Sequence, residues 1–180
     1  MPQENIRVQT YKSPVGELLM GSYAGKLVLC DWRYRKMRAA VDKRLQSALQ
    51  ANYSDGDSSV LAQTREELQQ YFAGDRQHFD VALQFVGSPF QCQVWQQLCQ
   101  LNYGETCSYL SLAQRLGDAK KVRAAAAANG ANAISILVPC HRIIGSDGKL
   151  VGYAGGLPAK RKLLELEGAL SGPEQQCLAF

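Results

Sequence analysis

Residues 108–130 read SYLSLAQRLGDAKKVRAAAAANG, and this stretch predicts two short helices joined by a tight turn. The first helix is expected to face Leu110, Ala113 and Leu116 inward, and Gly117 interrupts it. Asp118 is a suitable N-cap for a second helix over 119–129. Two helices joined by a short glycine-containing turn are typical of a helix-turn-helix. An ordinary helical hairpin gives the same pattern, so the motif alone leaves DNA binding and simple packing as alternatives.

The second helix of this pair has an unusual composition, because Arg123 is followed by five alanines at 124–128. Such a helix could pack tightly against another helix, or it could approach a nucleic-acid groove closely. Sequence-specific reading of the major groove needs several long polar side chains, and this helix has few. If it binds DNA, we therefore expect little sequence preference. Four basic residues cluster here: Arg115, Lys120, Lys121 and Arg123.

Composition places the chain among ordinary globular proteins, with 180 residues, 46% hydrophobic residues and 20% charged residues. No apolar run is long enough for a membrane span, and the first residues lack the pattern of a secretory signal. The six cysteines are therefore expected to be free thiols in a reducing compartment rather than disulfides. We expect a cytoplasmic protein, associated with the nucleoid in a prokaryote or located in the nucleus in a eukaryote.

The chain divides by pattern into an N-terminal domain (1–87), a C-terminal domain (88–170) and a tail (171–180). The N-terminal part predicts a strand near Ile6, a hairpin and two helices, with a polar loop over 52–59. Ser88 and Pro89 predict the start of a helix in the second part. The predicted hairpin strands are 18–22 and 27–32, and the predicted N-terminal helices lie within 37–49 and 60–72.

A second stretch carries the residues that could take part in catalysis. Residues 133–144 read AISILVPCHRII, which predicts a strand over 133–138 that ends at a proline and is followed by Cys140 and His141. A cysteine becomes a good nucleophile when a nearby base raises its thiolate fraction. Adjacent residues need not face each other, so a buried structural cysteine is the alternative. A glycine-rich loop over 152–157 and a helix over 160–167 follow.

Three features together resemble the O6-alkylguanine-DNA alkyltransferases, also called methylated-DNA-protein-cysteine methyltransferases. They are Pro-Cys-His-Arg at 139–142, the glycine-rich loop at 152–157, and the helix-turn-helix that ends in Asn-Gly-Ala-Asn at 129–132. The resemblance covers 86–168 closely and the N-terminal third loosely. It implies an α+β fold, with a small ribonuclease-H-like β-sheet and flanking helices first, and a mostly helical, winged helix-turn-helix-like domain second.

The resemblance also implies catalytic roles. Cys140 would accept the alkyl group from O6-alkylguanine, with O4-alkylthymine as a second candidate substrate. His141 would take the thiol proton through a water molecule, and Glu167 would orient His141. Tyr109 would donate its hydroxyl to N3 of the guanine. Because a thioether is a poor leaving group, we expect one irreversible turnover per molecule.

Further residues would hold the DNA and the extruded base. Arg123 would enter the base stack in place of the extruded nucleotide, and Asn132 would brace the active-site turn. Relatives commonly have proline at the position of Ala133 and a larger polar residue at that of Ala131, which affects loop stiffness and one phosphate contact. The other implied base-binding residues are Ile143, Tyr153 and Ala154, and the other implied DNA-binding residues are Lys120, Lys121, Ala124 and Ala127.

The implied partner is double-stranded DNA that contains O6-alkylguanine, bound by a monomer or cooperatively by several copies. No cofactor is implied. A metal site is not predicted either, because the chain has two histidines and no closely spaced cysteine pair. The alternatives are a non-catalytic sensor or regulator that binds alkylated DNA, which would not need Cys140, and a cysteine hydrolase, which would not need the alanine-rich helix.

Overall fold

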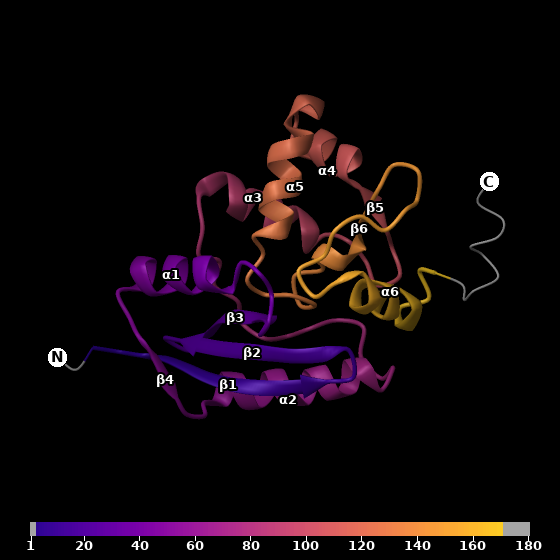
Figure 1. The fold of residues 1–180 in the computed structure, drawn as a ribbon. Coiled ribbons are helices and arrows are strands. Elements are labelled where there is room, and N and C mark those ends of the chain that lie inside the picture. Colours follow the sequence, from indigo (N-terminus) through magenta and orange to yellow (C-terminus); the bar gives the residue numbers. More distant parts are fainter. Residues whose placement is uncertain (1–2, 171–180) are drawn as a thin grey trace.

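Four strands form the sheet of the N-terminal unit in the computed structural model, which describes residues 3–170 (Figure 1). The order across the sheet is β3-β2-β1-β4, with β1 and β4 parallel and the other neighbours antiparallel. Their bounds are Ile6–Ser13 for β1, Gly16–Tyr23 for β2, Lys26–Trp32 for β3 and Tyr53–Asp55 for β4. The predicted loop over 52–59 therefore contains a strand, because the residues of β4 pair with the start of β1.

Two helices complete this unit, α1 (Arg38–Leu49) and α2 (Ser59–Phe72). The side chain of Ser58 caps α2 by accepting a hydrogen bond from the Leu61 amide. The buried residues of α1 join those of β1 in one core cluster, whereas the buried residues of α2 join β2 and the helical unit in another. The two faces of the sheet therefore pack against different helices.

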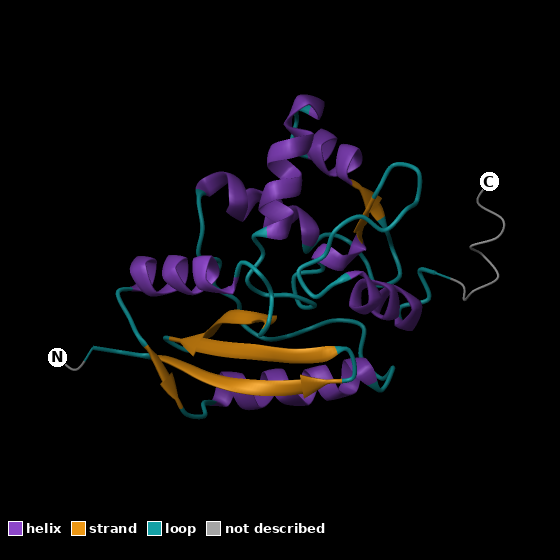
Figure 2. Cartoon of the chain, in the orientation of Figure 1, coloured by secondary structure: helices purple, strands orange, loops and turns teal. Residues whose placement is uncertain are grey.

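Helices make up most of the second unit (Figure 2). Its first helix begins with a capping box in which Ser88 and Gln91 satisfy each other's backbone amides, as the predicted cap requires. The elements are α3 (Pro89–Leu98), β5 (Cys107–Ser108), α4 (Tyr109–Arg115), η1 (Ala119–Lys121), α5 (Val122–Gly130), η2 (Cys140–Arg142), β6 (Ile143–Ile144) and α6 (Leu157–Leu166). The fold is α+β, as the sequence predicts.

Three local predictions are wrong. The helix expected over 119–129 begins with a 3-10 turn, so α5 starts at Val122. Leu110 is 40% exposed rather than inward, because the buried face of α4 is formed by Leu112 and by Ala113, whose inward position the sequence predicts correctly. Residues 133–138 form no regular strand, since their backbone pairs with β3 only at Cys30 and then turns, held by the Asn132 side chain.

The two units join at the free edge of β3. Cys30 donates its amide to the Ala133 carbonyl at 2.8 Å, and its carbonyl accepts from the Ser135 amide at 2.7 Å. Further along the same strand, Leu27 exchanges hydrogen bonds with 82–84. Both segments extend the sheet, so the backbone leading to Cys140 is attached directly to the N-terminal unit.

Some expectations concern residues that the structure does not describe. The predicted tail over 171–180 lies outside the described residues, and so does Cys177. Within 3–170, no helix is both long and apolar enough to cross a membrane.

Candidate active site

Asn132 shapes the turn that presents Cys140. Its side-chain amide donates to the Val138 carbonyl at 2.9 Å and to the Ile134 carbonyl at 3.3 Å, and its side-chain oxygen accepts from the Ile134 amide at 2.9 Å. Inside this turn, Ile136 adopts a φ of 72°, which is strained for a β-branched residue. One buried side chain thus supplies the hydrogen bonds that a neighbouring strand would otherwise give.

Cys140 lies at a cavity of about 430 Å³ between the two units, a volume within the range of small-molecule sites, roughly 300–1,000 Å³. The residue is 4% exposed. Burial raises the pKa of the Cys140 thiol, and the Asn132 side chain and the charge of Lys160 offset this only in part. The thiol is therefore protonated at neutral pH and needs a base to react.

His141 follows Cys140 directly and has one ring nitrogen bound and one without a partner among the described residues. Its Nε2 lies 2.7 Å from Oε1 of Glu167, and both side chains are fully buried. Its Nδ1 is buried and has no hydrogen-bond partner among the described residues. Burial lowers the pKa of His141, against the opposing effect of Glu167. The imidazole is thus neutral near pH 7, with one ring nitrogen bound to the carboxylate and the other able to accept a proton.

Glu167 follows α6 directly and is held by Arg142, which donates to both of its oxygens, Nε to Oε2 at 2.8 Å and NH2 to Oε1 at 3.0 Å. Burial alone would raise the pKa of Glu167, but the hydrogen bonds of His141 and Arg142 and the charge of Arg142 hold that pKa well below its usual range. The carboxylate is therefore ionised and acts only as an acceptor.

Tyr109 and the glycine-rich loop form another part of the cavity wall, together with Tyr153 and Ala154. The Tyr109 hydroxyl donates to the Val151 carbonyl at 2.8 Å. To donate to a ligand, this hydroxyl would have to give up its bond to Val151.

Lys160 supports the same loop and is a residue that the sequence did not single out. It is fully buried on α6, and its Nζ donates to the carbonyls of Gly152 at 3.1 Å and Val151 at 3.3 Å. Burial lowers its pKa to about 8, while the nearby Cys140 acts in the opposite direction. A signal existed, because Lys160 shares the helical face of Leu163, Leu164 and Glu167.

The helix-turn-helix consists of α4 and α5. Asp118 caps the turn by accepting from the Lys120 amide at 2.9 Å. Ala125 and Ala128 are buried, and the Ala128 carbonyl accepts from the Trp95 indole at 2.9 Å. The residues predicted to contact DNA are all exposed on the outer side: Lys120, Lys121, Arg123, Ala124 and Ala127.

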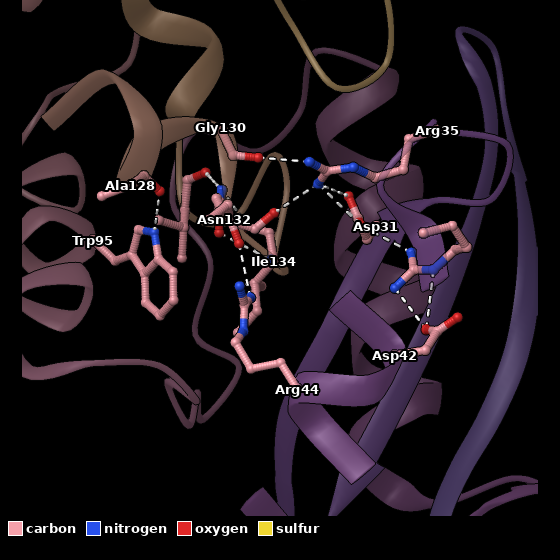
Figure 3. Close-up of polar contacts among 12 residues, drawn as sticks. Asp31, Arg35, Asp42, Arg44, Trp95, Ala128, Gly130, Asn132 and Ile134 are labelled. Carbon is pink, nitrogen blue, oxygen red and sulfur yellow. Dashed lines mark hydrogen bonds and ion pairs between the residues drawn. The ribbon is translucent and has the colours of Figure 1, made fainter. Parts of the chain in front are cut away.

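Two arginines of the N-terminal unit bind the end of α5 (Figure 3). Arg35 donates to the carbonyls of Gly130 at 2.6 Å and Asn132 at 3.3 Å, and Arg44 donates to the Ala131 carbonyl at 2.8 Å. The fully buried carboxylate of Asp31 orients Arg35 at 3.2 Å. We call Arg35 and Arg44 the arginine clamp. No local sequence pattern predicts it, because its members lie some ninety positions from their acceptors.

The predicted site residues thus fall into three places. Cys140, Tyr109, Tyr153, Ala154 and Ala127 line the cavity, and His141, Glu167 and Asn132 lie buried around it. Ile143 is fully buried, and its amide bonds to the Cys140 carbonyl. Arg123 and the two lysines lie on the outer side of α5 and η1. No group of three or more potential metal ligands occurs among the described residues.

Comparison with known families gives two matches that together span most of the chain. A model described as "6-O-methylguanine DNA methyltransferase, ribonuclease-like domain" matches residues 6–85. A model described as "6-O-methylguanine DNA methyltransferase, DNA binding domain" matches residues 89–169.

Individual relatives agree with these matches. Methylated-DNA–protein-cysteine methyltransferases from Methanosarcina acetivorans and Mycobacterium tuberculosis are 48% and 39% identical over 160 and 165 residues. The matched regions cover 88% and 90% of this chain and 96% and 92% of those proteins. The crystal structure of the M. tuberculosis O6-methylguanine methyltransferase superposes with a TM-score of 0.77 at 35% identity, over 96% of this chain and 99% of that one. A crystal structure of the M. tuberculosis protein in complex with DNA gives 0.78 at 35% identity, with the same coverage.

Proposed function

Because this chain belongs to the O6-methylguanine DNA methyltransferase family, which repairs DNA by methyl transfer to a protein cysteine, we propose that its acceptor is Cys140. Among the described cysteines, which are all free, Cys140 is the one at the cavity, next to a neutral histidine with an available nitrogen. That combination carries the proposal, because a buried thiol needs both room for a substrate and a route for its proton.

The transfer proceeds as a displacement at the alkyl carbon. A water molecule passes the thiol proton to Nδ1 of His141, and the imidazolium is stabilised by Glu167. The Cys140 sulfur then forms a bond to the carbon while the bond from that carbon to O6 breaks, and its electrons remain on the guanine. Tyr109 donates its hydroxyl to N3 and stabilises this charge. The product is a thioether, so each molecule acts once.

DNA binding uses the exposed side of α5. The target carbon lies inside the base stack, so the nucleotide must be extruded at a cost of a few kcal/mol. The alanines at 124 and 127 let the helix approach the groove closely, and Arg123 fills the space that the nucleotide leaves. Lys120 and Lys121 contact phosphates, which gives affinity without sequence preference.

The remaining parts of the proposal concern the state of the protein. We infer that one copy binds double-stranded DNA containing O6-alkylguanine, through a C-terminal domain over 88–170 that follows an N-terminal domain over 1–87. Free thiols at each described cysteine fit a reducing cytoplasm, with the protein on the nucleoid or, in a eukaryote, in the nucleus.

The test is to locate the methyl group. The protein is incubated with an excess of duplex oligonucleotide that contains O6-methylguanine, digested and analysed by mass spectrometry. We expect one methyl group per chain on the peptide with Cys140, none in Cys140→Ser, and unchanged transfer in the control Cys99→Ser, which alters an exposed cysteine. A methyl group on another residue, or more than one per chain, would contradict the proposal.

A further inference from the structure

Tyr71 connects the N-terminal unit to the charged network beside Cys140. It lies in the last turn of α2 and is fully buried. Its hydroxyl donates to Oε1 of Glu167 at 2.7 Å, across 96 positions of the sequence. This is the same oxygen that His141 contacts at 2.7 Å. A tyrosine of the sheet-bearing unit and the histidine therefore share one carboxylate oxygen.

The carboxylate has a nearly complete set of donors. Oε1 accepts from Tyr71, His141 and Arg142, and Oε2 accepts from Arg142 and, at 3.4 Å, from the Gly104 amide. A buried carboxylate with this many donors remains ionised. Since it can only accept, Nε2 of His141 must carry the hydrogen, which leaves Nδ1 as the acceptor that faces away from Glu167.

The Tyr71 hydroxyl acts against the histidine's interaction with Glu167. Its dipole neutralises part of the charge on Oε1, so the carboxylate stabilises an imidazolium less than it would without Tyr71. Burial, together with the charge and hydrogen bond of Glu167, raises the pKa of Tyr71, so the hydroxyl stays a donor throughout the neutral range. The ring is fixed by aromatic contacts with Phe72, Phe79 and Tyr103.

We propose that Tyr71 is a positioning residue for alkyl transfer, which holds Glu167 through its hydroxyl and keeps His141 neutral, so that Nδ1 can accept the Cys140 proton. The proposal rests on the roles given above to Cys140, His141 and Glu167. It makes the N-terminal unit part of the proton-accepting machinery as well as a support for the cavity.

The other charges near these groups come from two elements. Arg142 of η2 and Lys160 of α6 are positive and lower the pKa of His141. Tyr103, which precedes β5, is the only other tyrosine of this aromatic cluster, and its hydroxyl donates to the Leu166 carbonyl at 3.1 Å rather than to the carboxylate. Tyr103→Phe is thus a matched control: it removes a hydroxyl from the same cluster without removing a donor to Glu167.

The decisive measurement is an NMR titration of the imidazoles in the intact protein. The chain has two histidines, and the exposed His78 serves as an internal reference. In Tyr71→Phe we expect the pKa of His141 to rise by about one unit, since one hydrogen bond to a charged group is lost. Tyr103→Phe should leave it within about 0.3 unit of the wild type.

The same change should appear in the reaction. Only neutral His141 accepts a proton, so the rate of methyl transfer falls at acidic pH. In Tyr71→Phe this fall should occur at a pH that is higher by the same amount. At pH values above the fall, the rates of the variant and the wild type should be similar. A lower melting temperature without a shift in the pKa of His141 or in the pH of this fall would overturn the proposal, and so would equal shifts in both variants. If Cys140 of the wild type is not methylated, the assigned acceptor fails, while the titration still tests Tyr71.

A second measurement covers the case in which Tyr71→Phe does not fold. Wild-type protein made with 3-fluorotyrosine has a more acidic, stronger hydroxyl donor at position 71. The proposal then requires the pKa of His141 to fall, because Glu167 is better neutralised. An unchanged or higher value would overturn it.

Discussion

At the scale of single residues, Lys160 is the side chain whose environment differs most from what its type suggests. Its ammonium group is fully buried beside Cys140, with a pKa lowered to about 8. In the unfolded chain a lysine titrates near 10.4. Between these values the unfolded state binds more protons, so this residue should make the free energy of unfolding increase as the pH rises.

Replacement of Lys160 by methionine tests this directly, because methionine fills similar space without a charge. The difference in unfolding free energy between wild type and Lys160→Met should move in favour of the wild type by about 2 kcal/mol from pH 7.5 to pH 10. Urea unfolding at both pH values measures it. Lys162→Met, on the exposed side of α6, should show no such trend, and a flat difference for Lys160→Met would mean that the buried ammonium does not titrate in this range.

The individual residues of the site were predictable to unequal degrees. Cys140, His141 and Glu167 could be named from the resemblance to the family, and the structure places Cys140 at the cavity and His141 in contact with Glu167. Lys160 shares the apolar face of its helix, which indicates burial, but nothing local indicates what its ammonium group contacts. Tyr71 had the spacing of a core residue and gave no sign of its hydroxyl's partner, since contacts across 96 positions leave no local pattern.

At the scale of elements, α5 separates two tasks between its faces. Ala125 and Ala128 are buried against the rest of the unit, whereas Arg123 is exposed. If Arg123 takes the place of the extruded nucleotide, Arg123→Ala should slow repair of duplex DNA at least about tenfold, since extrusion costs a few kcal/mol. Transfer from free O6-benzylguanine should change less than about twofold, because no base stack is opened. Both rates follow from timed mass spectrometry.

Lys120→Ala is the matched control, since it removes an exposed cation next to the same helix. We expect weaker binding to all DNA sequences. The slope of the logarithm of the binding constant against the logarithm of the salt concentration should become about one unit less steep. Its transfer rate at saturating DNA should remain near that of the wild type. Equal losses on duplex and free base in Arg123→Ala would contradict the extrusion role.

Elements were predicted well where periodicity and capping determine them. The capped start at Ser88 and the hairpin of β2 and β3 follow local chemistry. The segment over 133–138 was wrong for a physical reason. Its apolar residues fit a buried strand, but Asn132 closes it into a turn by satisfying three backbone groups, and no periodicity records that competition.

At the scale of the whole molecule, the question is whether the two units fold as one. Their buried side chains form a shared core cluster, and β3 is extended by the segment that leads to Cys140. The arginine clamp adds polar bonds to the last carbonyls of α5, which a helix leaves without internal partners. These contacts predict a single cooperative unfolding transition.

The two tryptophans allow this to be tested, because Trp32 lies on β3 and Trp95 lies on α3. Trp32 can be observed alone in Trp95→Phe, and Trp95 alone in Trp32→Phe. Circular dichroism measures the effect of each substitution on stability. Once that effect is subtracted, we expect the two free energies of unfolding from fluorescence to agree. Two separated transitions within one variant would show that the units unfold independently.

Removing Arg35 and removing Arg44 should each lower the free energy of unfolding, but by different amounts. Arg35→Met leaves the buried Asp31 with Arg38 alone, and breaking a buried ion pair costs about 3–5 kcal/mol. Arg44→Met removes one hydrogen bond to a carbonyl and should cost about 1–2 kcal/mol. Asp31→Asn should recover part of the loss in the Arg35→Met background, because the unpaired charge is then absent. If Arg44→Met were the more damaging change, the ion pair with Asp31 would not be what stabilises the junction of the two units.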